Sequence, residues 1–458
     1  MVKRSGAIMQ DADSRDYKQR RAKDNSEESY EGDLINQLPD GIPVTILSKL
    51  PITDAARTSI LSRKWRYLWT FFSGPLVFDG SPIMKDMKRD IKKAEGKRHL
   101  QMAMEIMYDA ESQTYTSWID ELLSSLNGST LQGLKFWFHV DPGCDTDKWV
   151  HFAIQKKVQK LELYFGNTFE YVLPLHLFKL ESFNSLHVLR LKCITVTEEM
   201  LEYLLRCCPL LETLSLADSV LPKTMKVSGQ SLKLKCLELV RCWELLKLEI
   251  FAENLVSFKY YGSHLDTEFK CVPSLLEATF GGSFVELTTE SFLPHLEVLT
   301  LDITQNIPEV ICSLSQLPKL KNMKHLELVA CDDDGITLGA CALLLRASSP
   351  SLWRFTLKMI HTKPSLRTKR KITMKCQHGL KELELIGFCG ASCEVELATY
   401  ILKNAVELQK ITIDTRLPTR PKLRPLGEHF KAWDREENRN RARELQGKVP
   451  PWIDFVCI

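Results

Sequence analysis

The sequence lacks a long hydrophobic run, a paired-cysteine motif and an excess of charge of one sign. No apolar stretch approaches the roughly 18 residues of a membrane-spanning helix, so we expect no contact with a membrane. The 61 basic and 58 acidic residues leave a net charge of only +3 over 458 residues, which does not predict a nucleic-acid partner. The first residues are charged and lack a secretory signal, so nucleus or cytoplasm is the expected location.

The cysteines and the known catalytic motifs give no candidate for chemistry. Fourteen cysteines are present, but no C-x-x-C occurs, and Cys207-Cys208 and Cys389 to Cys393 lack partners at zinc-finger spacing. Inside a cell they should be reduced and packed as small hydrophobic residues. G-x-S-x-G, phosphate-loop, dinucleotide-loop and H-E-x-x-H motifs are also missing. We therefore expect a non-catalytic protein without cofactor or metal.

The amino-terminal segment 1–32 is polar and mixed in charge. It holds few large apolar residues, so it cannot offset the entropy cost of ordering, and we expect it to be disordered. The basic cluster between Lys18 and Lys23 is either a nuclear-localisation signal or a chance cluster on a solvated segment.

Residues 33–72 have the pattern of three short helices. Asp40 can cap the first helix, whose apolar residues have helical spacing up to Pro51, and Thr53 and Ser62 can cap the next two. Fewer than 40 residues cannot bury this much apolar surface by themselves. The pattern predicts either a docking module that completes its core on a partner or an ordinary helical cap on a larger domain.

The motifs in this segment resemble an F-box in the form common in plants. They are Leu38-Pro39-Asp40, Ile46-Leu47-Ser48-Lys49-Leu50-Pro51, Arg57-Thr58-Ser59 and Leu61-Ser62-Arg63-Lys64-Trp65-Arg66-x-Leu68-Trp69. The sequence departs from many F-boxes at Gly41-Ile42-Pro43, but Pro43 would lie in the first turn, where its missing N–H has no helical partner. The resemblance implies binding to the Skp-type adaptor of an SCF ubiquitin ligase, which is built on a cullin. The expected adaptor contacts are Leu38, Pro39, Ile42, Ile46, Leu47, Leu50 and Pro51, with Trp65 and Trp69 as packing anchors.

The segment 73–130 reads as a helical connector. Its basic residues from Lys85 to Arg98 alternate with acidic ones and suggest a solvated face or loop. Later, Trp118, Ile119, Leu122, Leu123 and Leu126 have helical spacing, which predicts a helix packed under the next region.

From residue 131 an apolar-x-x-apolar-x-apolar pattern recurs twelve times. Its first positions are Leu131, Val158, Leu186, Leu211, Leu234, Leu255, Leu275, Leu296, Met323, Leu352, Leu380 and Leu408. The period of 20 to 29 residues is that of a leucine-rich repeat. Each unit should give a strand and a return segment, some helical, with caps at Thr197 and Thr337. The units should stack into a solenoid with parallel strands, which we place at 131–370.

Alternate residues of these strands should form a concave surface of mixed charge, which suits a protein partner better than a phosphate backbone. Most of these residues are expected to be solvated, and the aromatic and arginine positions are the better candidates for target contacts. These candidates are Trp137, Tyr164, Arg190, Tyr261 and Arg354.

The end of the repeat region, 371–415, resembles the FBD module that closes many plant F-box/leucine-rich-repeat proteins. The resemblance lies in Leu380-Lys381-Glu382-Leu383-Glu384-Leu385, in the helical segment from Glu394 to Ala405, and in Leu408-x-Lys410-Ile411-x-Ile413. The alternative is two more ordinary repeats. The segment 416–458 is basic and proline-containing, so we expect an extended tail; docking of Trp452, Ile453 and Phe455 on the last repeat is the alternative.

These observations predict an α/β protein: a three-helix F-box, an irregular leucine-rich-repeat solenoid with parallel strands, and an FBD-like cap. The predicted function is a substrate receptor that holds an unknown target protein near a ubiquitin-conjugating enzyme. Two alternatives are a repeat scaffold without ubiquitin transfer and a receptor with a small molecule in the concavity of the solenoid.

Overall fold

The structure is a computed structural model. It describes residues 38–80, 98–138, 146–165, 171–180, 183–229, 232–282, 292–304, 312–331, 334–348, 351–360, 379–416 and 435–458. The expected disordered segment 1–32 and the basic residues from Lys85 to Lys97 lie outside these residues. No helix in the described part is both long and apolar enough to cross a bilayer.

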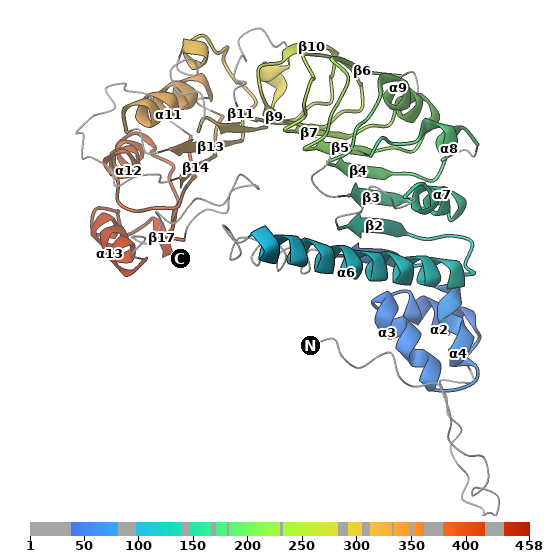
Figure 1. Ribbon diagram of the computed structural model, residues 1–458. Coiled ribbons are helices and arrows are strands. Elements are labelled where there is room, and N and C mark those ends of the chain that lie inside the picture. The colour runs from blue at the N-terminus through green and yellow to red at the C-terminus, as the bar shows by residue number, and fades with distance from the viewer. Residues whose placement is uncertain are drawn as a thin grey trace, which may run out of the picture.

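A parallel sheet of fourteen strands forms the inner side of an arch, as Figure 1 shows. All twelve predicted repeat strands are present and lie in sequence order, so this prediction is confirmed. They are β2 (Gly133–Trp137), β3 (Lys160–Tyr164), β4 (Val188–Lys192), β5 (Thr213–Ala217), β7 (Cys236–Val240), β9 (Ser257–Gly262), β11 (Glu277–Gly282), β12 (Val298–Asp302), β13 (His325–Cys331), β14 (Arg354–Ile360), β15 (Glu382–Ile386) and β16 (Lys410–Asp414).

Alternation of side chains along the strands separates the core from the concave surface. In β4, Leu189 and Leu191 are 0% and 1% exposed, and they pair with leucines at matching positions of β3 and β5. Residues between them, such as Arg190, point to the other side, because successive side chains of a strand alternate. The leucines of neighbouring strands therefore stack into one continuous core that no single repeat could bury.

The first and last strands of the sheet were not predicted. β1 (Pro75–Asp79) pairs with β2, although its segment was expected to belong to a helical connector. β17 (Asp454–Cys457) pairs with β16 and follows helix α13 (Arg435–Gln446). The expectation of an extended tail is therefore wrong for residues 435–458. The alternative prediction was docking of Trp452, Ile453 and Phe455 on the last repeat. Ile453 is 8% exposed and Phe455 is half-buried, but Trp452 stays 77% exposed.

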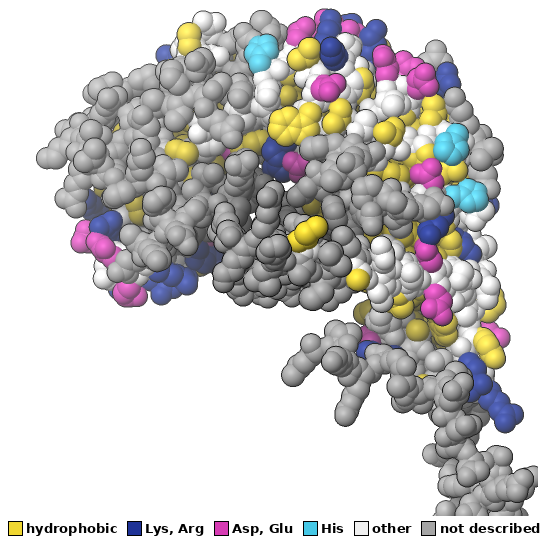
Figure 2. All heavy atoms as spheres, viewed as in Figure 1, with side chains coloured by type: hydrophobic (Ala, Val, Ile, Leu, Met, Phe, Trp, Pro, Cys, Tyr) yellow, Lys and Arg dark blue, Asp and Glu magenta, His cyan; other side chains and the backbone are white. Residues whose placement is uncertain are grey.

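A second, three-stranded parallel sheet covers the outer side of the shortest repeats. It contains β6 (Thr224–Ser228), β8 (Lys247–Phe251) and β10 (Asp266–Cys271), in the order β10-β8-β6. Repeats of 20 to 23 residues are too short for a helix on the return, so an extended segment takes its place. Figure 2 shows basic and acidic side chains intermingled over this part, where Lys247 and Lys270 pair with Glu249 and Glu268.

Helices lie on the outer side of the longer repeats. They are α7 (Asp147–Gln155), α8 (Leu175–Leu180), α9 (Glu198–Cys207), α11 (Asp334–Ser348) and α12 (Ser392–Asn404). The Thr197 hydroxyl accepts a hydrogen bond from the Met200 N–H, which confirms the predicted cap of α9. Thr337 does not begin α11: the helix starts at Asp334, and the Thr337 hydroxyl donates to the Cys331 carbonyl.

The long helix α6 (Arg98–Ser125) precedes the first predicted repeat and lies across the open side of the arch (Figure 1). Near its end, Ile119, Leu122 and Leu123 are at most 8% exposed, as predicted for a helix packed under the repeats. Trp118 remains 38% exposed, and its ring contacts Phe78 and Tyr115.

Candidate functional site

The short helix α2 (Gly41–Leu47) divides its apolar residues between two faces. Pro43 and Leu47 are buried, and Leu47 is 0% exposed. Ile42, Ile46 and Leu50 are 46%, 45% and 39% exposed. These three residues are four apart, so within the helix and its terminal turn they follow one another on one side. We call Ile42, Ile46 and Leu50 the α2 stripe.

The α2 stripe corrects one predicted adaptor contact. Leu47 was expected on the binding face, but it packs in the core of the module and offers no surface to a partner. Pro39 and Pro51 are exposed and Leu38 is half-buried, so these three predicted contacts are accessible. Trp65 is 4% exposed, as expected of a packing anchor, and Trp69 is half-buried against the same core.

The local caps of these helices differ in part from the predictions. The Asp40 carboxylate makes no cap hydrogen bond; it lies 3.1 Å from Lys64 Nζ instead. Helix α3 (Ile52–Arg57) begins directly after Pro51, so Thr53 lies inside it and is not its cap. The Ser62 hydroxyl does accept from the N–H of Trp65, the first residue of α4 (Trp65–Leu68).

Further apolar residues of the helical module are exposed and were not predicted as contacts. Ile60, Leu61 and Tyr67 are 87%, 64% and 65% exposed, and Phe71 is 49% exposed. In the sequence these residues resemble any apolar position of a short helix, since only the fold decides which face is covered. They extend the apolar surface that the module offers beyond the α2 stripe.

Hydrogen bonds fasten the module to the first turn of the solenoid. The Ser48 hydroxyl at the end of α2 accepts from the Ser73 N–H at 2.9 Å. Gly74 is required there, because a Cβ atom would lie 2.1 Å from the Ser48 carbonyl oxygen. The Asn127 N–H donates to the Thr70 carbonyl at 2.7 Å. These contacts set the position of the α2 stripe relative to the arch.

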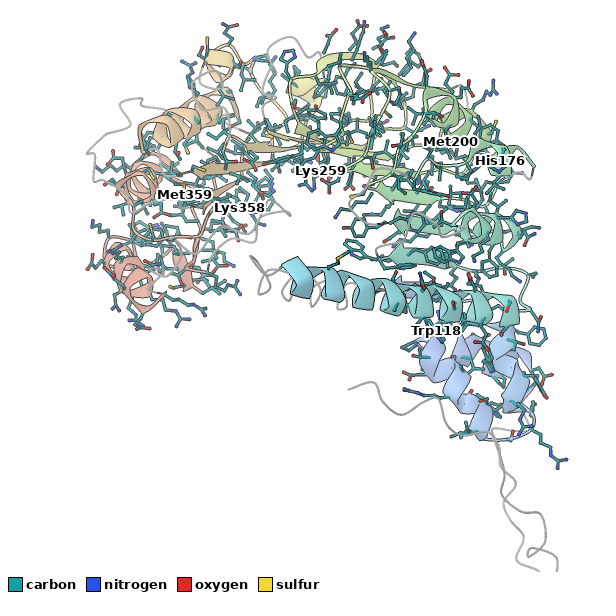
Figure 3. The ribbon with its side chains drawn as sticks, in the orientation of Figure 1. Trp118, His176, Met200, Lys259, Lys358 and Met359 are labelled. Carbon is teal, nitrogen blue, oxygen red and sulfur yellow. The ribbon has the colours of Figure 1, made fainter. Side chains whose placement is uncertain are left out.

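The concave surface changes its charge along the arch. Figure 3 shows Lys259 and Lys358 on its inner side, whereas Met200 belongs to an outer helix. From β2 to β9 the concave positions hold five basic residues (Lys135, Lys160, Arg190, Lys192 and Lys259) and two acidic ones (Glu162 and Glu238). From β11 to β16 they hold three basic residues (Arg354, Lys358 and Lys410) and six acidic ones (Glu277, Asp302, Glu327, Glu382, Glu384 and Asp414).

The basic half contains an organised group on β2, β3 and β4, which we call the basic–aromatic cluster. Its members are Lys135, Trp137, Lys160, Glu162, Tyr164, Arg190 and Lys192. Trp137 and Tyr164 meet edge to face, with ring centroids 5.0 Å apart. The Lys192 ammonium lies 4.4 Å from the Tyr164 ring centroid and 5.2 Å from that of Trp137, a cation–π geometry. Burial raises the pKa of Tyr164 to about 12, so its ring stays a neutral partner of the lysine.

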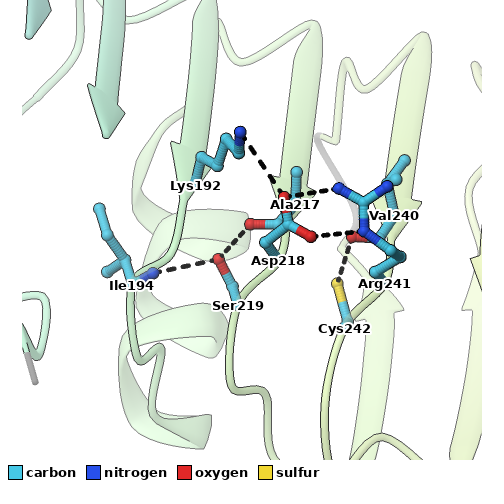
Figure 4. A network of polar contacts seen from close by, with 8 residues as sticks. All are labelled: Lys192, Ile194, Ala217, Asp218, Ser219, Val240, Arg241 and Cys242. Atoms are coloured by element: carbon cyan, nitrogen blue, oxygen red, sulfur yellow. Dashed lines mark hydrogen bonds and ion pairs between the residues drawn. The ribbon is translucent and has the colours of Figure 1, made fainter. Parts of the chain in front are cut away.

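An ionic network continues the cluster at the ends of β4, β5 and β7 (Figure 4). The Arg241 guanidinium donates to both carboxylate oxygens of Asp218, at 2.5 and 2.7 Å, and Lys192 Nζ lies 3.6 Å from the same carboxylate. The Ser219 hydroxyl accepts from the Ile194 N–H and donates to the Ala217 carbonyl. The network therefore fixes three successive turns and orients Lys192.

Two predicted target contacts have a structural role instead. Tyr261 is 6% exposed, and its hydroxyl donates to Asp302 at 2.7 Å across the intervening strand. Gly281 makes room for it, because a Cβ there would lie 2.4 Å from the Tyr261 ring. Tyr164 is also 6% exposed, and its ring contacts Trp137 and Lys192. Arg354 donates to Glu384 at 2.9 Å, but its side chain is 36% exposed, so it remains accessible. Trp137 and Arg190 remain accessible and lie together in the basic–aromatic cluster, far along the sheet from Arg354.

The described residues offer surfaces for binding. Within them no cluster of histidine, cysteine or acidic side chains has the arrangement of a metal site. Cys208 and Cys341 are buried, and burial raises the pKa of each thiol to about 12, so neither is a thiolate near neutral pH. Cys312 and Cys457 are exposed, contrary to the expectation that the cysteines are buried.

Comparison with known proteins also divides the chain into an amino-terminal helical module and a repeat region. The family model of the F-box domain matches residues 35–73, and that of the At1g61320/AtMIF1 LRR domain matches residues 176–438. Similar proteins from Arabidopsis thaliana include the putative F-box protein At3g58860, 25% identical over 86% of this chain and 91% of its own length. The F-box/LRR-repeat protein At4g14096 is 23% identical over 93% of this chain and 94% of its own. The F-box/FBD/LRR-repeat protein At5g22660 is 24% identical, with 83% and 89% covered. Because the repeat model covers more than half of the residues, the chain belongs to the At1g61320/AtMIF1 leucine-rich-repeat family, with an F-box domain ahead of its repeats.

Proposed function

We propose that the protein is the substrate receptor of an SCF-type ubiquitin ligase in the nucleus or cytoplasm. The F-box binds the Skp-type adaptor, the adaptor joins the cullin, and the concave surface of the repeats holds the target protein. The observation that carries this proposal is the α2 stripe, an apolar surface left open on a helix whose opposite face, with Pro43 and Leu47, is buried. The receptor contributes proximity, because it raises the local concentration of target lysines near the charged conjugating enzyme.

The α2 stripe has the composition of an interface centre. Ile42, Ile46 and Leu50 are aliphatic and half-exposed, and they lie on or just after a short helix that is anchored to the rest of the protein. Each such side chain that passes from half to full burial gains roughly 1 kcal/mol, before the cost of association. The exposed Pro39 and Pro51 flank the stripe and extend the surface at both ends.

The strand–helix–strand order of β15, α12 and β16 supports an FBD-like module at 371–415 as part of this proposal. Its role differs from that expected, because β17 and α13 follow it and cover the end of the sheet. Residues 371–378 lie outside the described part of the chain.

The test is co-purification of the full chain with the Skp-type adaptor and the cullin. The triple variant Ile42→Ala/Ile46→Ala/Leu50→Ala should lose adaptor binding by about a hundredfold, because it removes the aliphatic surface and leaves the buried face intact. The matched control is Val172→Ala/Leu246→Ala/Val406→Ala, three aliphatic residues of the repeats that are 48%, 60% and 82% exposed. It should bind the adaptor as the wild type does.

Two outcomes contradict the proposal. If the α2 triple variant retains wild-type affinity, the adaptor surface is assigned to the wrong residues. If the wild-type protein binds neither adaptor nor cullin, a repeat scaffold without ubiquitin transfer is the better description.

A further inference from the structure

We propose that the basic–aromatic cluster on β2, β3 and β4 binds an acidic, extended segment of the target protein. This inference rests on the proposed function for the statement that the concave surface is the target surface. It adds the chemical class of the segment and its place on the sheet.

The charges of the cluster do not balance. Glu162 is its one carboxylate, and three cations surround it: Lys160 Nζ at 2.8 Å, Lys135 Nζ at 3.2 Å and Arg190 Nε at 4.0 Å. The two lysines lower the pKa of Glu162 against the effect of its burial, so the carboxylate stays ionised at neutral pH. One negative charge cannot neutralise three positive ones, and the excess remains on the surface.

The three cations remain accessible to a partner. The side chains of Lys160, Arg190 and Lys135 are 53%, 47% and 34% exposed, whereas Glu162 beneath them is only 16% exposed. The shared carboxylate holds the cationic side chains in place and thereby reduces the entropy cost of ordering them on binding. A carboxylate of a partner would meet positive charge that is already positioned.

The other half of the concave surface carries the opposite excess of charge. From β11 to β16 acidic residues outnumber basic ones, six to three, and Arg354 is shared between Glu382 and Glu384. An acidic segment would be repelled there and attracted by the half that extends from β2 to β9. The charge distribution therefore places this segment at the amino-terminal end of the sheet.

The spacing favours an extended peptide over a nucleic acid. Strands β2 and β4 are two strand spacings apart, about 10 Å, which an extended chain covers in about three residues. In the polyproline II form of an extended chain, residues three apart lie on one face about 9 Å from each other, so acidic side chains at that spacing could reach Lys135 and Arg190 together. A phosphate backbone carries a charge on every nucleotide and would also meet Glu162 and Glu238, whereas a peptide can place neutral residues opposite these two carboxylates.

The experiment uses fluorescence anisotropy with the full chain and labelled peptides of about twelve residues. The probe carries glutamate at every third position between glycine and serine, and the reference peptide carries glutamine there. We expect the glutamate peptide to bind at least about tenfold more tightly and to weaken as salt is raised. Lys160→Glu/Arg190→Glu should weaken it by about tenfold, and Lys160→Gln/Arg190→Gln by less.

The matched control is Lys235→Glu/Lys324→Glu. These lysines are both 55% exposed, each pairs with one glutamate, and they precede β7 and β13 outside the cluster. The control makes the same change in net charge, so it should leave affinity within about twofold of the wild type. Thermal unfolding of every variant shows that it is folded before its affinity is interpreted.

Three results would overturn the inference: equal affinity for the glutamate and glutamine peptides, equal loss in the cluster and control variants, or tighter binding of a single-stranded oligonucleotide of similar length. Adaptor co-purification is measured on the same preparations. Loss of acidic preference with intact adaptor binding defeats this inference alone, whereas loss of adaptor binding with intact peptide binding defeats the proposed function alone.

Discussion

The F-box and the repeats differ in how completely they bury their apolar residues. In the repeats, the inward residues of each strand are covered by the strands on both sides, as Leu189, Leu214 and Leu237 show at 0% exposure. In the F-box, helix α2 buries Leu47 completely but leaves its neighbour Ile46 45% exposed. Both regions are rich in aliphatic residues, yet only one of them completes its own core.

This difference separates residues that stabilise the protein from residues available for a partner. Stacking buries a repeat on two sides, so each inward leucine contributes to folding. A module of three short helices has too little area to bury all its apolar residues, so a remainder faces solvent. The comparison predicts that substitutions of similar size will affect stability in one region and binding in the other.

The largest loss of stability is expected inside the solenoid. Leu239 of β7 is 0% exposed and lies in register between Leu216 of β5 and Tyr260 of β9. Leu239→Ala removes buried methyl groups and leaves a cavity, which should lower the free energy of unfolding by about 2–5 kcal/mol. Chemical denaturation followed by circular dichroism measures the change. A loss below about 1 kcal/mol would contradict the contrast between the repeats and the F-box, because the position would then behave as a surface residue.

A smaller and sharper comparison lies within the F-box itself, between Leu47 and Ile46. Leu47→Ala should lower stability by about 2–3 kcal/mol, because its side chain is completely buried. Ile46→Ala should cost less than about 1 kcal/mol and should weaken adaptor binding instead. Thermal unfolding and adaptor affinity are measured on both variants. If Leu47→Ala remains as stable as Ile46→Ala, the assignment of the two faces of α2 is wrong.

The sequence predicts the repeat strands well, because the same pattern recurs at every turn. Because the apolar motif occurs at twelve positions, each occurrence supports the strand assignment of the others. This holds even at Leu275, where Ala278 takes the middle position. β1 and β17 have no such support. In β1 only Leu76 and Phe78 alternate with exposed residues, and a five-residue segment outside the repeat period gives a weak signal.

The candidate site was predictable in residue type but not in orientation. The F-box motif locates the α2 stripe, yet Ile46 and Leu47 are adjacent aliphatic residues, and only the packing of α2 shows which one is covered. On the concave surface, strand alternation correctly places Tyr261. It does not show that Gly281 lies beside Tyr261 and leaves room for the Tyr261 hydroxyl to reach Asp302. A hydrogen bond across three strands depends on register, which a single sequence does not show.

The smallest expected effect is a pH dependence within the repeats. His325 of β13 has its pKa lowered from 6.5, first by burial and then by the Arg354 guanidinium, while Glu327 and Glu384 act in the opposite direction and Lys358 in the same one. Since the unfolded chain binds a proton more readily, the contribution of neutral His325 is complete above pH 6.5 and is lost as pH falls through the folded-state pKa. The variant His325→Gln keeps a side chain that can hydrogen-bond to Thr356, whose hydroxyl lies 3.1 Å from His325 Nε2, but it cannot titrate. Thermal unfolding at about pH 7.5 and about pH 5.5 should therefore show a larger loss of stability for the wild type than for the variant. The other histidines are common to both proteins, so equal losses would show that protonation of His325 does not oppose folding.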